Sequence, residues 1–116
     1  MLRMNGQLQE ITIVRGDSGI IKVVDHDLTK TERPFSEGTV VSLGVKRAVR
    51  DEEYLLLKQV TSFSPEGHAY IEFDPEDTSS KPIGKFLYDL EVKRPSGWVD
   101  TFINNKLFII KNDIVK

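Results

Sequence analysis

The chain has 116 residues, of which 39% are hydrophobic and 29% charged, and this is the composition of one folded domain rather than of a disordered segment. Its formal net charge of −2 provides no positive field with which to hold a nucleic-acid backbone. The sequence contains no cysteine, which excludes disulfide frameworks, thiolate zinc sites and cysteine nucleophiles.

The N-terminal segment carries no recognisable targeting signal. The first ten residues lack the apolar stretch of a signal peptide, and no segment is long and apolar enough to span a membrane. We therefore expect a single domain over residues 1–116, made in a cytoplasm, in which residues 1–9 form a flexible N-terminus.

The hydrophobic pattern along the chain is that of β-strands. Within residues 85–94, for example, Phe86 and Tyr88 point to one face while Lys85 and Asp89 point to the other. We expect eight strands, over residues 8–15, 19–25, 39–49, 54–62, 68–74, 85–94, 98–103 and 106–111. Short strands in this number predict an all-β domain, either an antiparallel β-sandwich or a small barrel.

The tripeptide Arg15-Gly16-Asp17 spells a cell-attachment motif, but its surroundings indicate a structural role. Apolar residues precede and follow it, which places it within or between strands rather than on a protruding tip. Gly16 can supply the kink at which a chain leaves one sheet for another. We expect Arg15 and Asp17 to tie the first strand to neighbouring turns by hydrogen bonds.

Two acidic segments have side chains that metals bind, yet neither has the spacing of a metal site. In Asp25-His26-Asp27, alternate residues of a strand would face one side, so that the two carboxylates converge without the imidazole. We interpret this segment as a polar turn. The acids of residues 74–77 do not match a calcium-binding loop. No metal and no cofactor is therefore expected.

Turn signals separate the expected strands. Residues 64–67 and 94–97 both have proline second and glycine fourth, which predicts type I turns. Residues 104–105, both asparagine, favour a two-residue hairpin. Asp74 and Pro75 begin a segment that predicts one helical turn near residues 75–80, bridging two strands and passing from one sheet to the other.

No catalytic constellation is present in the sequence. None of the serines lies in a G-x-S-x-G turn, neither His26 nor His68 has a nucleophile signature beside it, and there is no glycine-rich phosphate loop. We therefore expect a protein that is not an enzyme.

Two strands are more apolar than a half-exposed strand needs to be. Residues 55–57 and 107–110 are apolar on both faces, so either loops cover their outer sides or they contact another protein. Core packing is the favoured interpretation for Trp98, with an interface role as the alternative. The candidate interface residues are Leu55, Leu57, Trp98, Phe102, Phe108 and Ile110.

The order of these signals resembles the immunoglobulin-like N-terminal domain of upper-baseplate (tail) proteins from phages of Gram-positive bacteria. Such domains open with an Arg-Gly-Asp-Ser/Thr box, continue with an apolar strand and an Asp-containing turn, and later carry a Pro-x-Asp-Thr box, a glycine and an aromatic strand ending in Tyr-Asp. The match covers residues 10–116. The residues that carry the two boxes and the aromatic strand are Arg15, Gly16, Asp17, Ser18, Pro75, Asp77, Thr78, Gly84, Phe86, Tyr88 and Asp89.

Two departures from the family pattern leave the nearest member of the family open. The family turn often carries glycine where this chain has residues 25–29, and the leucine usual before the later glycine is replaced by residues 81–83. The sequence also has no C-terminal stalk or receptor-binding segment, so we expect either a protein that is only the adaptor domain or a fragment of a longer one.

The resemblance implies an immunoglobulin-like β-sandwich of about seven or eight strands that acts as an adaptor in a phage or prophage tail baseplate. Its partners would be other baseplate and tail proteins, a homo-oligomer within the assembly would be expected, and the protein would reside in the virion. The expected absence of an active site and the surplus apolar surface agree with this role.

Two rival functions remain open at the level of sequence. One is a carbohydrate-binding β-sandwich that recognises host cell-wall glycan and uses Trp98, Tyr70 or Tyr54 as a stacking surface. The other is an inert domain that positions the catalytic neighbour of a larger enzyme.

Overall fold

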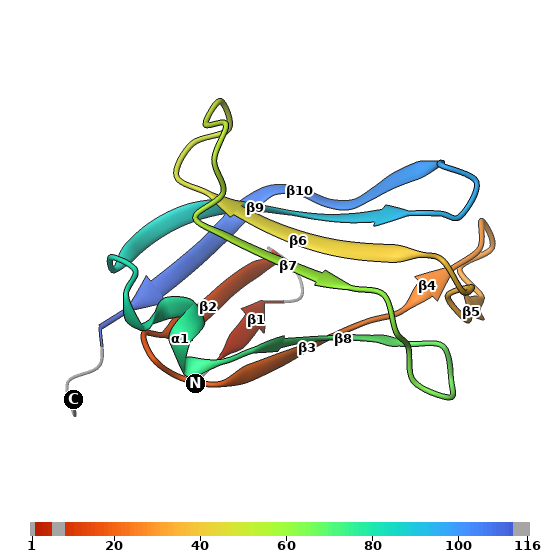
Figure 1. The fold of residues 1–116 in the computed structure, drawn as a ribbon, viewed down its shortest axis with the longest axis horizontal. Helices are drawn as coiled ribbons and strands as arrows, with labels where there is room; N and C mark the ends of the chain where they lie inside the picture. The colour runs from red at the N-terminus through yellow and green to blue at the C-terminus, as the bar shows by residue number, and fades with distance from the viewer. Residues whose placement is uncertain (1, 6–8, 113–116) are drawn as a thin grey trace.

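The computed structural model describes residues 2–5 and 9–112, and β-strands make up most of its regular structure (Figure 1). A single short helix, α1 (Pro75–Ser79), is found among the described residues. The strands are β1 (Arg3–Asn5), β2 (Glu10–Val14), β3 (Gly19–Val23), β4 (Asp25–His26), β5 (Glu32–Arg33), β6 (Val40–Lys46), β7 (Leu56–Val60), β8 (Ala69–Phe73), β9 (Gly84–Lys93) and β10 (Val99–Lys111). The all-β prediction is confirmed.

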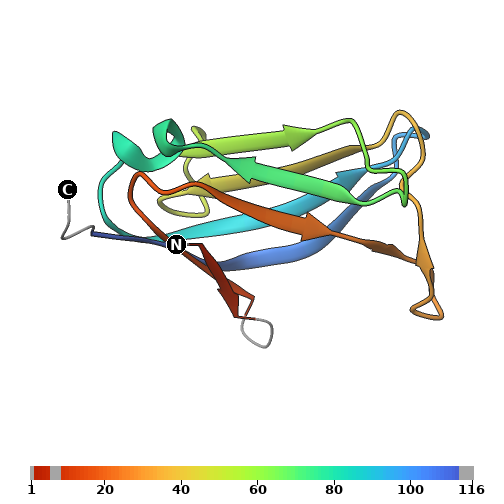
Figure 2. The same cartoon turned by 90° about the horizontal axis from the view of Figure 1, so that it is seen from below.

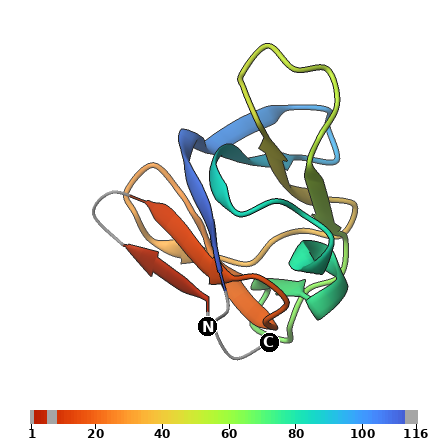
Figure 3. The ribbon, with the colours of Figure 1, turned by 90° about the vertical axis from the view of Figure 1, so that its left-hand side faces the viewer.

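The strands form one large sheet and two small ones. The large sheet has the order β1-β2-β10-β9-β6-β7, while β3 pairs with β8 and β4 pairs with β5. The β3–β8 pair lies in front of the large sheet in Figure 2. The end-on view shows the β3–β8 pair and the large sheet as separate layers (Figure 3). All pairs are antiparallel except β2 and β10, which run parallel. The prediction of a purely antiparallel arrangement is therefore wrong at this pair.

The core lies between the two layers and is built by strict alternation. In β6, β8 and β9, every second side chain turns inward and is buried, as the sequence pattern predicts. The residues concerned are Val41, Leu43, Val45, Ala69, Ile71, Phe73, Phe86, Tyr88, Leu90 and Val92. The opposite face of the large sheet points outward, and the groove described below lies on that outward face.

Both predicted proline–glycine turns are present. The Gly67 N–H donates to the Ser64 carbonyl at 2.8 Å, and the Gly97 N–H donates to the Arg94 carbonyl at 2.9 Å. Each glycine has a positive φ, +80° at Gly67 and +92° at Gly97, which closes the turn with a left-handed residue. The second turn joins β9 to β10, and the first lies in the connection from β7 to β8.

The predicted hairpin at residues 104–105 is wrong. β10 continues from Val99 to Lys111 without reversing, and its register against β9 shifts between Thr101 and Ile103 and again between Ile103 and Lys106. Asn105 does adopt the positive φ that its type tolerates, +58°, but it does so within this irregularity of a continuous strand. The two strands expected at 98–103 and 106–111 are therefore one.

The helical turn is confirmed, and it crosses from one sheet to the other. α1 follows β8 of the two-stranded sheet and precedes β9 of the large sheet. Pro75 stands at its start, and the Asp77 carboxylate accepts a hydrogen bond from the Asp74 N–H at 2.8 Å. At the N-terminus, β1 pairs with β2, so residues 3–5 are part of the sheet rather than a flexible tail; residues 1 and 6–8 lie outside the described part.

Candidate functional site

The Arg15-Gly16-Asp17 segment forms the turn between β2 of the large sheet and β3 of the second sheet. The Asp17 N–H donates to the Val14 carbonyl at 3.0 Å, and the Arg15 N–H donates to the Lys111 carbonyl of β10 at 2.9 Å. Gly16 has a φ of +86°, and all three residues are half-buried. The predicted kink between sheets is confirmed, and these backbone hydrogen bonds help to hold it. A free, protruding attachment tip is contradicted.

Thr78 of α1 also contacts this turn, through a hydrogen bond of its side chain. Its side-chain Oγ1 accepts a hydrogen bond from the Gly16 N–H at 2.8 Å, and Thr78 is fully buried. Beside it, Asp77 pairs with Lys58 of β7 at 2.9 Å. The Arg-Gly-Asp box and the Pro-x-Asp-Thr box, which lie 62 residues apart in the sequence, are thus in direct contact.

The remaining residues of the family motif are dispersed over β9. Gly84 opens the strand opposite Ile110. Tyr88 is buried and its hydroxyl donates to the Gln9 carbonyl. Burial raises the pKa of Tyr88 to about 12. Asp89 points to the outer face, where its carboxylate accepts a hydrogen bond from the Asn105 N–H at 2.6 Å. These residues therefore do not converge on a common site.

The candidate interface residues divide into buried and exposed ones. Phe108 and Ile110 are 0% and 2% exposed, so the prediction that they contribute to an interface is wrong: both belong to the core of this chain, where Phe108 packs against Phe73 of β8. Leu55 and Phe102 are half-buried against the core. Leu57 and Trp98 are 45% and 69% exposed, and the expected core packing of Trp98 is therefore wrong.

Trp98 belongs to an exposed surface at one end of the molecule, which we call the tip. The β9–β10 turn and the β4–β5 turn both lie at that end, on the right of Figure 1, and residues of both line one hollow. The Trp98 Nε1 donates to the Asp100 carboxylate at 3.0 Å, which orients the indole ring. The tip is lined by Leu28, Arg33, Trp98, Asp100 and Phe102.

An ion network around the buried Asp25 connects residues of the tip. Asp25 is 1% exposed and forms two hydrogen bonds with Arg94, at 2.6 and 2.9 Å, and one with Arg33 at 3.0 Å. Arg94 also reaches Asp100 at 3.1 Å and lies about 6 Å from the ring centre of Phe102. Burial alone would raise the pKa of Asp25, but the hydrogen bonds and charges of the two arginines outweigh it and lower that pKa.

The sequence offered no means of finding this network. Asp25 was expected in a polar turn, whereas it lies in β4 and faces inward. Asp27 does follow the turn prediction, since its carboxylate accepts hydrogen bonds from the Thr29 and Thr31 N–H groups. Arg94 and Asp25 are 69 residues apart, so that no local pattern relates them.

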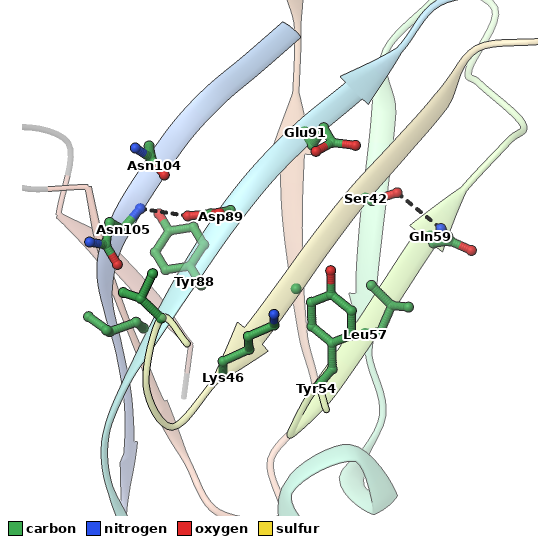
Figure 4. A pocket seen from close by; sticks show the side chains of 13 residues that line it. Ser42, Lys46, Tyr54, Leu57, Gln59, Tyr88, Asp89, Glu91, Asn104 and Asn105 are labelled. Carbon is green, nitrogen blue, oxygen red and sulfur yellow. Dashed lines mark hydrogen bonds between the residues drawn. The ribbon is translucent and has the colours of Figure 1, made fainter. Parts of the chain in front are cut away.

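A groove crosses the outward face of the large sheet, over β6, β7, β9 and β10. It has a volume of about 470 Å³ and we call it the outer groove (Figure 4). On one side Tyr54 and Lys46 lie side by side, and on the other Asp89 lies beside Asn105 (Figure 4). Its lining comprises Ser42, Gly44, Lys46, Val49, Tyr54, Leu57, Gln59, Leu87, Tyr88, Asp89, Glu91, Asn104 and Asn105.

No protein-family model matches this chain, and neither the curated proteins nor the solved structures contain a significant match. Within residues 2–5 and 9–112, no group of three histidine or acidic side chains is placed to hold a metal ion. No helix in that same part of the chain is long and apolar enough to cross a membrane.

Proposed function

We propose that this chain is a structural adaptor module of a phage or prophage tail baseplate, and that it docks onto other tail proteins without catalysing a reaction. The observation that carries the proposal is the hydrogen bond from the Gly16 N–H to Thr78 Oγ1. It joins the two boxes on which the family resemblance depends. Two short sequence boxes support a family resemblance more strongly when they contact each other in the structure than when each only matches in sequence.

We infer an immunoglobulin-like sandwich within the all-β fold. In the variable type of that fold, a C′ strand extends a sheet made of strands C, F and G, and the B and E strands lie in the opposite layer. The order β10-β9-β6-β7, with β3 and β8 in the second layer, supports this assignment. The crossing from β8 to β9 through α1 would then correspond to the connection between strands E and F.

The tip is the surface best suited to dock a tail protein. Tryptophan and arginine are among the residues that most often dominate binding energy at protein interfaces, and the tip includes both Trp98 and Arg33. Trp98 is held in place by Asp100, so little conformational entropy remains to be lost on binding. Leu28, which is fully exposed, extends the apolar part of this surface.

The test is co-purification of the full chain with each tail protein encoded beside its gene. We expect one of them to bind, and Trp98→Ala to weaken the complex by at least about tenfold. Tyr70→Ala is the matched control, because Tyr70 is an exposed aromatic residue on β8, outside the tip. Failure of every neighbouring tail protein to bind, or a gene located outside a tail-morphogenesis cluster, would refute the proposal.

A second candidate is recognition of host cell-wall glycan, and the exposure of Trp98 favours it. An indole ring with 69% of its surface exposed is available to stack on a sugar. A cell-wall pull-down separates the two functions at the tip. Saturable binding to cell walls that Trp98→Ala abolishes, without any association with tail proteins, would favour this candidate.

A further inference from the structure

The outer groove contains an aromatic ring that the sheet holds in place. Tyr54 lies on β6 at Gly44, where a Cβ atom would stand 2.5 Å from the Tyr54 Cε1. Any larger residue at position 44 would therefore displace the ring. The Lys46 ammonium lies 4.8 Å from the ring centre and attracts its negative face. Tyr54 nevertheless remains 51% exposed.

A glycine at position 44 destabilises the strand, and the close approach of the Tyr54 ring explains why a glycine is present there. A glycine inside a strand loses more conformational entropy on folding than other residues and offers no side chain to pack. Gly44 lies mid-strand in β6, paired with β7 on one side and β9 on the other. Interior glycines of this kind often mark a site where another group approaches the backbone closely.

Around the ring, the groove presents planar polar groups. Glu91, Gln59 and Asn104 are all exposed. Figure 4 shows Glu91 between Asn104 on one side and the Ser42–Gln59 pair on the other. The Gln59 amide donates to Ser42 Oγ at 3.2 Å, which orients it. An amide supplies a donor and an acceptor side by side, and a carboxylate supplies two acceptors, so that each can bind two adjacent hydroxyls of a sugar.

The charges and the size of the groove narrow the class of ligand. The lining carries one positive charge, on Lys46, and two negative charges, on Asp89 and Glu91. This excess of negative charge disfavours an anionic ligand. Charged residues are depleted at the centre of protein–protein interfaces, whereas three charged residues line this groove. The volume of about 470 Å³ falls within the range of small-molecule sites, roughly 300–1,000 Å³.

We propose that the outer groove binds a neutral saccharide. The apolar C–H face of a sugar ring packs on the part of the Tyr54 ring that Gly44 and Lys46 leave exposed, and Glu91, Gln59 and Asn104 hydrogen-bond its hydroxyls. This site lies on the sheet face and does not include Trp98 or any other residue of the tip. The proposed sugar site therefore does not depend on whether the chain docks onto a phage tail.

The experiment is a titration of the full chain with neutral hexoses, N-acetylhexosamines and their disaccharides, followed by NMR. We expect one of these sugars to bind saturably and to shift the amide signals of β6, β7 and β9. Tyr54→Ala and Glu91→Gln should each weaken binding by at least about tenfold, a loss of about 1.4 kcal/mol. Tyr54→Phe, which keeps the ring, should bind within a few-fold of the original protein.

Two further variants make the test specific to the groove. Gly44→Ala removes no lining group but displaces the ring, so we expect it to weaken binding as Tyr54→Ala does. Tyr70→Ala, at an exposed aromatic residue of β8 that lies outside the groove and the tip, should leave the affinity unchanged. The proposal is overturned if no sugar of the panel saturates up to about 10 mM, or if Trp98→Ala abolishes binding while Tyr54→Ala does not. Binding of an extended peptide in place of every sugar would also overturn it.

Discussion

At the scale of single residues, Asp25 shows how a buried charge can be stabilised at the end of a small β-domain. An isolated carboxylate would be too costly to bury, but Arg94 and Arg33 provide three hydrogen bonds to its oxygens. The same hydrogen bonds raise the pKa of Arg94, so both partners stay charged over the physiological range. The network at the tip is therefore fully charged at neutral pH and can lose its charge pairing only in acid.

We predict that acid weakens this network. The pKa of Asp25 is lower in the folded than in the unfolded chain, so its contribution is complete above the unfolded value of about 3.9 and is lost as pH falls through the folded value. Asp25→Asn should cost about 3–5 kcal/mol of unfolding free energy at pH 7. Urea unfolding at pH 7, 5 and 3 should show that cost shrinking toward pH 3.

Asp100→Asn is the control for this prediction. Asp100 pairs with the same arginine, but its side chain is 37% exposed, so its loss should cost no more than about 1 kcal/mol. A penalty for Asp25→Asn that stays the same at all three pH values would show that the cost arises from packing rather than from charge.

Thr78 is a second residue whose side chain has a defined partner. Thr78→Val keeps the shape but removes the hydroxyl that accepts a hydrogen bond from the Gly16 N–H, and we expect a loss of about 1–3 kcal/mol. Thr78→Ser keeps the hydroxyl and should lose less. Thr101→Val, at an exposed site on β10, should stay within about 0.5 kcal/mol of the original protein. Equal effects of Thr78→Val and Thr101→Val in urea unfolding would contradict a role for the bond.

At the scale of elements, the strands and turns follow local chemistry closely. Alternation of apolar and polar side chains placed β6, β8 and β9, and the proline–glycine pattern placed the turns at 64–67 and 94–97. The failure at Asn104–Asn105 has a clear physical cause. A residue that tolerates a positive φ serves a bulge within a strand as well as it serves a hairpin, and only the pairing with β9 distinguishes the two.

The two turns allow a matched test of what glycine contributes. Both Gly67 and Gly97 have a positive φ, but a Cβ at Gly67 would stand 2.2 Å from the Pro34 Cβ, whereas one at Gly97 meets nothing within 4 Å. We expect Gly97→Ala to cost about 1 kcal/mol through backbone strain alone. Gly67→Ala should cost about 3 kcal/mol, because crowding is added. Thermal unfolding of the two variants measures the difference, and equal losses would show that Pro34 moves aside freely.

At the scale of the whole molecule, the large sheet and the β3–β8 pair enclose one core, whereas β4 and β5 form only a two-residue pair at its edge. Strands β6 and β9 are hydrogen-bonded on both sides, and opening them would expose the core. The molecule should therefore be least stable locally at the tip.

Hydrogen exchange can measure this gradient of stability. We predict that amides at the centres of β6 and β9 exchange only by global unfolding, and that the amides of β4 and β5 exchange by local opening at a lower free energy. Native-state exchange followed by NMR at increasing urea distinguishes the two classes. Equal protection in β4 and β9 would mean that the ion network at Asp25 makes the tip part of the cooperative core.

The sequence by itself determined the all-β class, the inward-facing residues of the long strands, the two glycine turns and the helical turn. These features depend on backbone preferences and side-chain periodicity, which residues close in the sequence share. The tertiary structure alone decided the parallel pairing of β2 with β10, the continuity of β10, the Asp25–Arg94 ion pair and the position of Tyr54 on Gly44. Each of these joins groups that approach one another only after the sheets have formed, so that no local pattern specifies them. For the same reason Trp98, expected in the core, lies exposed at the tip.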